Sequence, residues 1–121
     1  MTRILVIEDE EPIRANLERF LKLEGFVVTT AGDGRSGAAA ARSLLPDLIL
    51  CDLVMPGMDG YQVISELSGD PRTRHIPLIV VSASADERER AGSIARGARD
   101  HITKPFELKT ILETIRRFLP N

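Results

Sequence analysis

Short apolar runs alternate along the chain with longer stretches in which apolar residues recur at helical spacing. Runs rich in Val, Ile and Leu cover residues 3–7, 26–30, 47–52 and 78–83, and a shorter, more polar run follows at 100–103. Unbroken apolar runs of this length are typical of strands that are covered on both faces. We therefore predict five β-strands, all but the last of them buried from both sides.

The stretches between these runs predict five helices. They extend from Pro12 to the stop signal Gly25, from Ser36 to Leu45, from the cap Asp59 to Gly69, over residues 85–96, and from Leu108 to Leu119. The fourth helix is polar, contains Gly92 and has few apolar anchors. We therefore expect it to be the least firmly held of the five.

Five strands that alternate with five helices predict an α/β fold, a doubly wound parallel sheet with helices on both faces. The length of 121 residues predicts one domain over residues 1–121. In such sheets, ligands bind beyond the carboxyl ends of the strands, where the strand order reverses. The residues at those strand ends are therefore the candidates for function.

Composition excludes several classes of protein. The net charge is −2, so the chain carries no overall basic field for nucleic acid or an anionic membrane. No apolar stretch approaches the length of a membrane span, and the N-terminus has no signal-peptide pattern. Cys51 is the only cysteine, which excludes an internal disulfide and fits a reducing, cytoplasmic location. We expect Cys51 to be a packed strand residue.

Carboxylates follow two of the predicted strands. Glu8 and Asp9 come directly after residues 3–7, and Asp52 ends the third strand. If the first and third strands are neighbours, about 4.8 Å apart, these side chains come close together. Three converging carboxylates repel one another unless a cation lies among them, and an all-oxygen donor set favours Mg²⁺ or Mn²⁺.

Ser82 and Lys104 complete the same edge of the sheet. Ser82 lies near the end of the fourth strand, beside the third, so a short hydroxyl can reach a group attached to Asp52. Lys104 follows the fifth strand, roughly 10 Å away, a gap that only a long side chain can close. An ammonium, a hydroxyl and a divalent cation around one carboxylate predict a site for a phosphoryl group carried on that carboxylate.

The sequence resembles the response-regulator receiver domain of bacterial two-component signalling over essentially its whole length. The matching segments are ILVIEDEEP, LILCDLVMPGMDG, LIVVSASAD and ITKPF. The resemblance implies a (βα)5 flavodoxin-like fold with strand order 2-1-3-4-5, the order found in a chemotaxis protein of this family. It also implies that Asp52 is the aspartate that accepts the phosphoryl group, and that the chain is a phosphoacceptor rather than an enzyme, although it assists its own phosphorylation and dephosphorylation.

The resemblance assigns a role to each residue at the strand ends. It implies that Asp9 binds the metal directly, that Glu8 does so through water, and that the backbone carbonyl of Val54 is a third protein ligand beside Asp52. Ser82 matches the switch hydroxyl, and Lys104 matches the lysine that pairs with the phosphoryl group. The Lys104–Pro105 peptide bond matches one that is cis in the family. The next two acidic residues, Glu10 and Glu11, are expected to complement a helix dipole.

His101 stands where the family usually has Tyr or Phe, at a position that swings inward when the switch hydroxyl engages the phosphoryl group. One hypothesis is that His101 is a switch residue that tunes signalling rather than phosphorylation, and the alternative is an exposed histidine at a strand edge. His75 is expected to be solvated. Val54 and Ser84 match positions that influence water attack on the acyl phosphate, and neither is a strong base. We therefore expect a persistent phospho-form.

The implied partners are a histidine kinase or histidine phosphotransfer protein, and a downstream protein or tethered output domain, with no direct contact to nucleic acid or membrane. The expected output surface is the fourth helix, fifth strand and fifth helix, with Arg88, Arg90, Arg96 and Arg99. A phosphorylation-dependent dimer stays open.

Three other functions compete with this interpretation. A degenerate receiver would act only as a protein-binding module, although its acidic pocket would be expected to have decayed. A haloacid-dehalogenase-like phosphatase would need a second Asp at position 54 and room for a cap domain. A flavodoxin-like electron carrier would need a phosphate-binding loop where the four carboxylates Glu8 to Glu11 stand.

Overall fold

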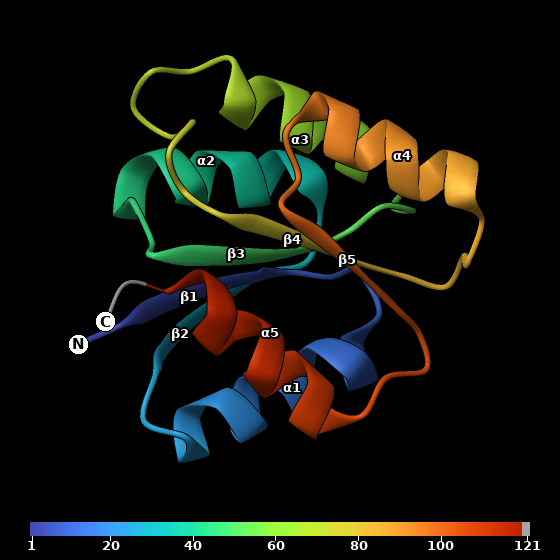
Figure 1. Cartoon of the computed structure of the whole chain (residues 1–121). Helices are drawn as coiled ribbons and strands as arrows, with labels where there is room; N and C mark the ends of the chain where they lie inside the picture. The colour runs from blue at the N-terminus through green and yellow to red at the C-terminus, as the bar shows by residue number, and fades with distance from the viewer. Residues whose placement is uncertain (120–121) are drawn as a thin grey trace.

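Strands and helices alternate along the computed structural model, which describes residues 1–119 (Figure 1). The strands are β1 (Arg3–Ile7), β2 (Val27–Ala31), β3 (Leu48–Asp52), β4 (Leu78–Ser82) and β5 (Asp100–Thr103). The helices are α1 (Glu11–Leu23), α2 (Gly34–Leu44), α3 (Gly60–Ser68), α4 (Glu87–Arg96) and α5 (Leu108–Phe118). All strand pairs are parallel and the order is β2-β1-β3-β4-β5, which confirms the predicted fold.

Two hydrophobic clusters lie on opposite faces of the sheet. Helices α1 and α5 cover one face, and α2, α3 and α4 cover the other (Figure 1). Along β1, Ile4 and Val6 belong to the cluster under α1 and α5, whereas Leu5 and Ile7 belong to the cluster under α2 and α3. Successive side chains of a strand point to opposite faces, so a strand covered on both sides must be apolar at every position.

Strand β2 does not follow the prediction that it is buried on both faces. It lies at the edge of the sheet, and Val27 and Thr29 are exposed whereas Val28 is buried. An edge strand here has cover on one face only, so its residues alternate between core and solvent. The Val-Thr composition of β2 is compatible with either environment, and the sequence pattern therefore could not separate them.

Element bounds differ from the sequence prediction by one or two residues, each for a local reason. Asp33 caps α2 by accepting the N–H of Ser36, so that helix begins at residue 34 rather than 36. Asp86 caps α4 by accepting the N–H of Arg88, so α4 begins at residue 87 rather than 85. Phe26 lies in the turn before β2.

Helix α4 is anchored more weakly than the other helices. Ser93 is its only buried residue, whereas α3 buries four residues, Gly60, Val63, Ile64 and Leu67. The expectation that this helix is the least firmly held is therefore supported by its burial. Burial of apolar surface is the main source of helix stability in a folded protein, so α4 is the element that can move at least cost.

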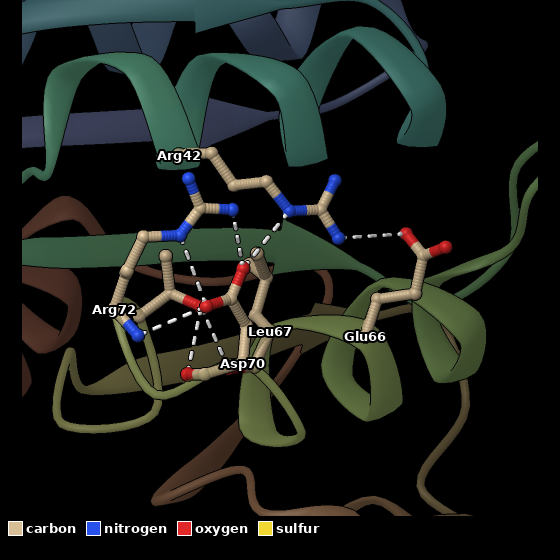
Figure 2. Close-up of polar contacts among 6 residues, drawn as sticks. Arg42, Glu66, Leu67, Asp70 and Arg72 are labelled. Atoms are coloured by element: carbon tan, nitrogen blue, oxygen red, sulfur yellow. Dashed lines mark hydrogen bonds and ion pairs between the residues drawn. The ribbon is translucent and has the colours of Figure 1, made fainter.

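A group of ion pairs fastens α2 to α3 on the same face of the sheet (Figure 2). Arg42 of α2 lies 3.5 Å from a carboxylate oxygen of Glu66 and 3.3 Å from one of Asp70, and Arg72 lies 2.9 Å from Asp70. The hydrogen bonds from Arg72 hold the pKa of Asp70 well below its usual range.

No helix in residues 1–119 has the length and apolar character needed to cross a bilayer.

Candidate functional site

Three carboxylates converge at the carboxyl ends of β1 and β3. The register pairs Ile7 with Cys51, so Glu8 and Asp52 follow at the same level on neighbouring strands. Each of Glu8, Asp9 and Asp52 offers an oxygen, and these oxygens lie within 4.8 Å of one another. Glu8 and Asp52 are only 2% and 4% exposed, so water screens their repulsion poorly.

Lys104 supplies the positive charge among these carboxylates. Its Nζ lies 2.7 Å from Glu8 Oε1 and 3.2 Å from Asp52 Oδ2, so the side chain spans from the end of β5 to both β3 and β1. Burial raises the pKa of Glu8 to about 7, against the lowering effects of the Lys104 ammonium and the Glu10 N–H. Burial opposes the charge of Lys104, but its two carboxylate partners outweigh burial and raise its pKa.

Asp9 differs from its neighbours because one of its oxygens has no partner. Asp9 Oδ1 is buried and accepts no hydrogen bond. A buried carboxylate oxygen without a donor costs free energy unless a cation or water satisfies it. Together with Glu8 and Asp52, it forms an all-oxygen donor set that fits Mg²⁺ or Mn²⁺ better than zinc or copper. The residues present therefore fit the metal that the resemblance implies.

The loop after β3 packs tightly behind Asp52. The Val54 N–H donates to Asp52 Oδ1 at 3.3 Å, and the Val54 side chain is 70% exposed at the mouth of the site. A Cβ on Gly60 would lie 2.2 Å from the carbonyl oxygen of Asp52, so a side chain is excluded there. Asp59 caps α3 in a capping box with Gln62, which fixes where the loop ends.

Ser82 lies at the same edge without contacting Asp52. Its side chain is fully buried, and its Oγ accepts the N–H of Ser84 at 3.3 Å. No hydrogen bond joins Ser82 to Asp52 within residues 1–119. The Lys104 N–H donates to the carbonyl of Ser82 at 2.7 Å, so the ends of β4 and β5 are tied together. The Lys104–Pro105 bond is cis, as the resemblance implied.

His101 lies inside the protein, and the alternative that it is an exposed edge residue is wrong. It is 7% exposed, although β5 is an edge strand, and its Nε2 is buried with no hydrogen-bond partner. Burial lowers the pKa of His101, and the charge of Arg90 lowers it further. His101 is therefore held neutral and inward near neutral pH.

The other residues singled out by the sequence lie away from this edge or in its surroundings. Cys51 is buried, as expected, and burial raises the pKa of its thiol. His75 is exposed. Arg96 of α4 stacks its guanidinium 4.6 Å from the ring of Tyr61 on α3, and its place on the output surface stays a prediction.

Arg99 lies just before β5 and lines a hollow with Asp47 and His75, so its place on the output surface likewise stays a prediction. Arg90 does face β5, 3.7 Å from Asp100.

Two contacts at the site were missed by sequence reasoning. The Lys104–Glu8 ion pair depends on how far one side chain extends over two intervening strands, which a sequence does not record. Arg14 donates from Nη1 to the carbonyl oxygens of Glu8 and Asp9 at 2.9 and 3.4 Å. A carbonyl oxygen belongs to every residue type, so no sequence signal could have found this second contact.

Comparison with known proteins identifies the family. The response regulator receiver domain matches residues 4–116. PilH of Pseudomonas aeruginosa is 38% identical over 119 residues, which cover 98% of this chain and 98% of PilH. Several longer curated proteins also match, and the chain spans between 23% and 52% of their length.

Solved structures agree. The chemotaxis protein CheY4 of Vibrio cholerae superposes with a TM-score of 0.93 at 28% identity, over 98% of this chain and 99% of CheY4. The receiver domain of the sensor histidine kinase PA1611 from Pseudomonas aeruginosa, which has a magnesium ion coordinated in its active site cleft, gives a TM-score of 0.90. It is 28% identical, over 97% of this chain and 96% of that domain. This chain therefore belongs to the response regulator receiver domain family.

Proposed function

We propose that Asp52 accepts a phosphoryl group from a phosphohistidine of a histidine kinase or histidine phosphotransfer protein, with Mg²⁺ bound by Glu8, Asp9, Asp52 and the Val54 carbonyl. One observation carries this proposal: the nearly buried Asp52 carboxylate lies 3.2 Å from the Lys104 ammonium and beside the partnerless oxygen of Asp9. The magnesium ion in the related PA1611 receiver supports the choice of metal.

The transfer is a substitution at phosphorus. An oxygen of Asp52 forms the new bond to phosphorus while the bond from phosphorus to the donor histidine nitrogen breaks, and the imidazole keeps the electron pair. Lys104, already within reach of Asp52, neutralises charge on the transferred oxygens. When bound, Mg²⁺ would supply further positive charge, which offsets the negative charge on the phosphoryl oxygens in the transition state. The chain takes up one group per cycle and turns over no separate substrate.

The phosphoryl group then acts as a switch. The Ser82 hydroxyl oxygen accepts a hydrogen bond from the Ser84 N–H before phosphorylation. On phosphorylation, this hydroxyl turns toward a phosphoryl oxygen and draws the end of β4 inward. Because Lys104 ties β5 to Ser82 and α4 is weakly anchored, the surface of α4, β5 and α5 changes with it. His101, buried beneath this surface, tunes the readout rather than the phosphorylation step.

The output lies outside this domain. A downstream protein, a tethered output domain or a second phosphorylated copy reads the changed surface, and the longer relatives favour the tethered arrangement for some members. The protein works in the cytoplasm, where kinase and phosphodonor are available. Neither Val54 nor Ser84 supplies a base for water, so the phospho-form persists.

Intact mass spectrometry tests the phosphoacceptor assignment. The chain is incubated with acetyl phosphate and Mg²⁺, beside Asp52→Asn and an EDTA-treated sample. We expect one added phosphoryl group in the wild type and none in those two controls. Asp47→Asn, at the opposite end of β3, is the matched control and should take up phosphate as the wild type does.

Absence of an adduct in the wild type would leave rapid hydrolysis or a degenerate receiver that only binds protein. Beryllofluoride, a mimic that does not hydrolyse, separates the two. Amide shifts at Asp52 and Ser82 on its addition would indicate fast turnover. No response to beryllofluoride would refute the phosphoacceptor assignment and favour the binding module.

A further inference from the structure

Arg14 is a cation surrounded by acidic residues with which it forms no ion pair. The four carboxylates Glu8 to Glu11 precede it, yet in residues 1–119 its guanidinium lies within salt-bridge distance of none of them. Instead, Nη1 donates to two backbone carbonyls, those of Glu8 at 2.9 Å and Asp9 at 3.4 Å. Arg14 therefore binds two backbone carbonyls and none of the neighbouring carboxylates.

The two carbonyls are those of the residues whose carboxylates face Asp52. The Glu8 N–H still pairs with the carbonyl of Ala31, but β1 ends at Ile7 and the carbonyls beyond it have no strand partner. Arg14 donates a hydrogen bond to each of these two carbonyls. It therefore holds the turn between β1 and α1 in place from outside the metal site. Fixing both carbonyls also fixes the direction of both side chains.

Gly32, in the loop after β2, lies directly beside the Arg14 guanidinium. A Cβ at this position would lie 3.2 Å from Arg14 Nη1, closer than ordinary van der Waals contact. The backbone of Gly32 is not in the left-handed region, so its conformation alone does not call for glycine. The missing side chain instead leaves room for the guanidinium, which is therefore seated between the loops that follow β1 and β2.

We propose that Arg14 is a positioning residue that holds the turn after β1 so that Asp9 presents its partnerless oxygen to Mg²⁺. The inference rests on the proposed metal site and adds a residue that does not touch the metal. An arginine paired with Asp9 would compete with the ion for the same oxygen, whereas an arginine paired with carbonyls leaves that oxygen available. Groups that orient metal ligands from behind commonly contribute tenfold or more to affinity.

The sign of the effect separates positioning from charge. Removing a cation beside an acidic site strengthens binding of another cation if charge alone matters. If Arg14 positions Asp9, the neutral variant Arg14→Gln instead binds Mg²⁺ more weakly, by about tenfold. Arg14→Lys keeps the charge but loses the planar pair of donors, so it should fall between wild type and Arg14→Gln.

The probe is Mg²⁺ alone, added at constant ionic strength and followed by the amide NMR shifts of residues near Asp52. Gly32→Ala retains every charge but crowds the guanidinium, and should weaken Mg²⁺ binding in the same direction by a smaller factor. The double variant Arg14→Gln with Gly32→Ala should bind no more weakly than Arg14→Gln, since both act through one contact. Arg19→Gln removes an exposed cation from the same helix and should leave the affinity unchanged.

Tighter or unchanged Mg²⁺ binding by Arg14→Gln, with wild-type binding intact, would overturn this inference alone. A wild type that binds no Mg²⁺ would overturn the proposed metal site and this inference with it. If Arg14→Gln does not fold, as judged by its NMR spectrum in EDTA, Gly32→Ala and Arg14→Lys decide the matter. Wild-type affinity in both of those variants would refute the positioning role.

Discussion

Glu8 is a buried acid whose ionisation works against folding when no metal is bound. Its carboxyl has an ordinary pKa of 4.5 and a pKa of about 7 in the folded protein, chiefly because it is buried. The folded state therefore holds this proton more tightly than the unfolded state does. It follows that stability falls as pH rises from about 4.5 to about 7, which is opposite to the usual behaviour of a salt-bridged carboxylate. Glu8→Gln removes this titration and keeps an acceptor near Lys104.

The two pKa values give the size of the effect. Each tenfold difference in proton affinity corresponds to about 1.4 kcal/mol, so ionised Glu8 opposes folding by roughly 3 kcal/mol at pH 8. At pH 5 the folded carboxyl is protonated, and the loss is only about 1 kcal/mol by the same relation. Between pH 5 and pH 8, the metal-free wild type should therefore lose about 2 kcal/mol of unfolding free energy relative to Glu8→Gln.

Urea unfolding in EDTA, followed by circular dichroism because the chain has no Trp, measures both proteins across this range. Subtracting the two curves removes every other titrating group. Glu113→Gln, an exposed glutamate on α5, is the matched control and should run parallel to the wild type. If the wild type and Glu8→Gln also ran parallel from pH 5 to pH 8, burial would not be what raises the pKa of Glu8.

Four further predictions concern this edge of the sheet and the strand β5 beside it. Gly60→Ala forces a Cβ against the Asp52 carbonyl, and should lower the free energy of urea unfolding by roughly 3 kcal/mol; a loss under about 1 kcal/mol would contradict the tight packing. His101→Phe removes the partnerless buried nitrogen and should raise the free energy of unfolding by about 1 kcal/mol at pH 7. The difference between the variant and the wild type should grow as pH falls below 6.5. Burial lowers the pKa of His101, so the wild type loses stability there as the unfolded state takes up the proton. Phosphorylation of His101→Ala by acetyl phosphate should match the wild type while partner binding changes, and the reverse pattern would refute the tuning role. Phospho-Asp52 should persist in the wild type and decay several-fold faster in Val54→Asn, which can orient water; equal decay rates would argue against the persistent phospho-form.

The sequence was most informative where periodicity and strand order act together. Unbroken apolar runs predicted the central strands because those strands are covered on both faces, and the bounds of β1 and β5 agree with the prediction. Parallel order alone brings the ends of β1, β3 and β5 to one edge, which is why the closeness of Asp52 and Lys104 could be predicted. Their assigned roles in phosphoryl transfer stay predictions.

Details that depend on side-chain direction could not be predicted. Whether His101 points in or out depends on the packing of α4 over β5, and both are compatible with DHIT. The position of Arg96 depends on the rotation of α4, which has too few apolar residues for its buried side to be recognised. The support of the turn after β1 by Arg14 runs through backbone atoms, which no residue pattern encodes.

The weak anchorage of α4 has a consequence for how such a protein can diversify. Ser93 is the only residue that this helix buries, so substitutions at its solvent-facing positions leave both hydrophobic clusters intact. Helix α2 has less freedom, because it buries four residues and a change at Arg42 removes its ion pairs with both Glu66 and Asp70. A descendant of this chain could acquire a new binding partner by changing α4 alone, and would inherit the chemistry at the strand ends unaltered.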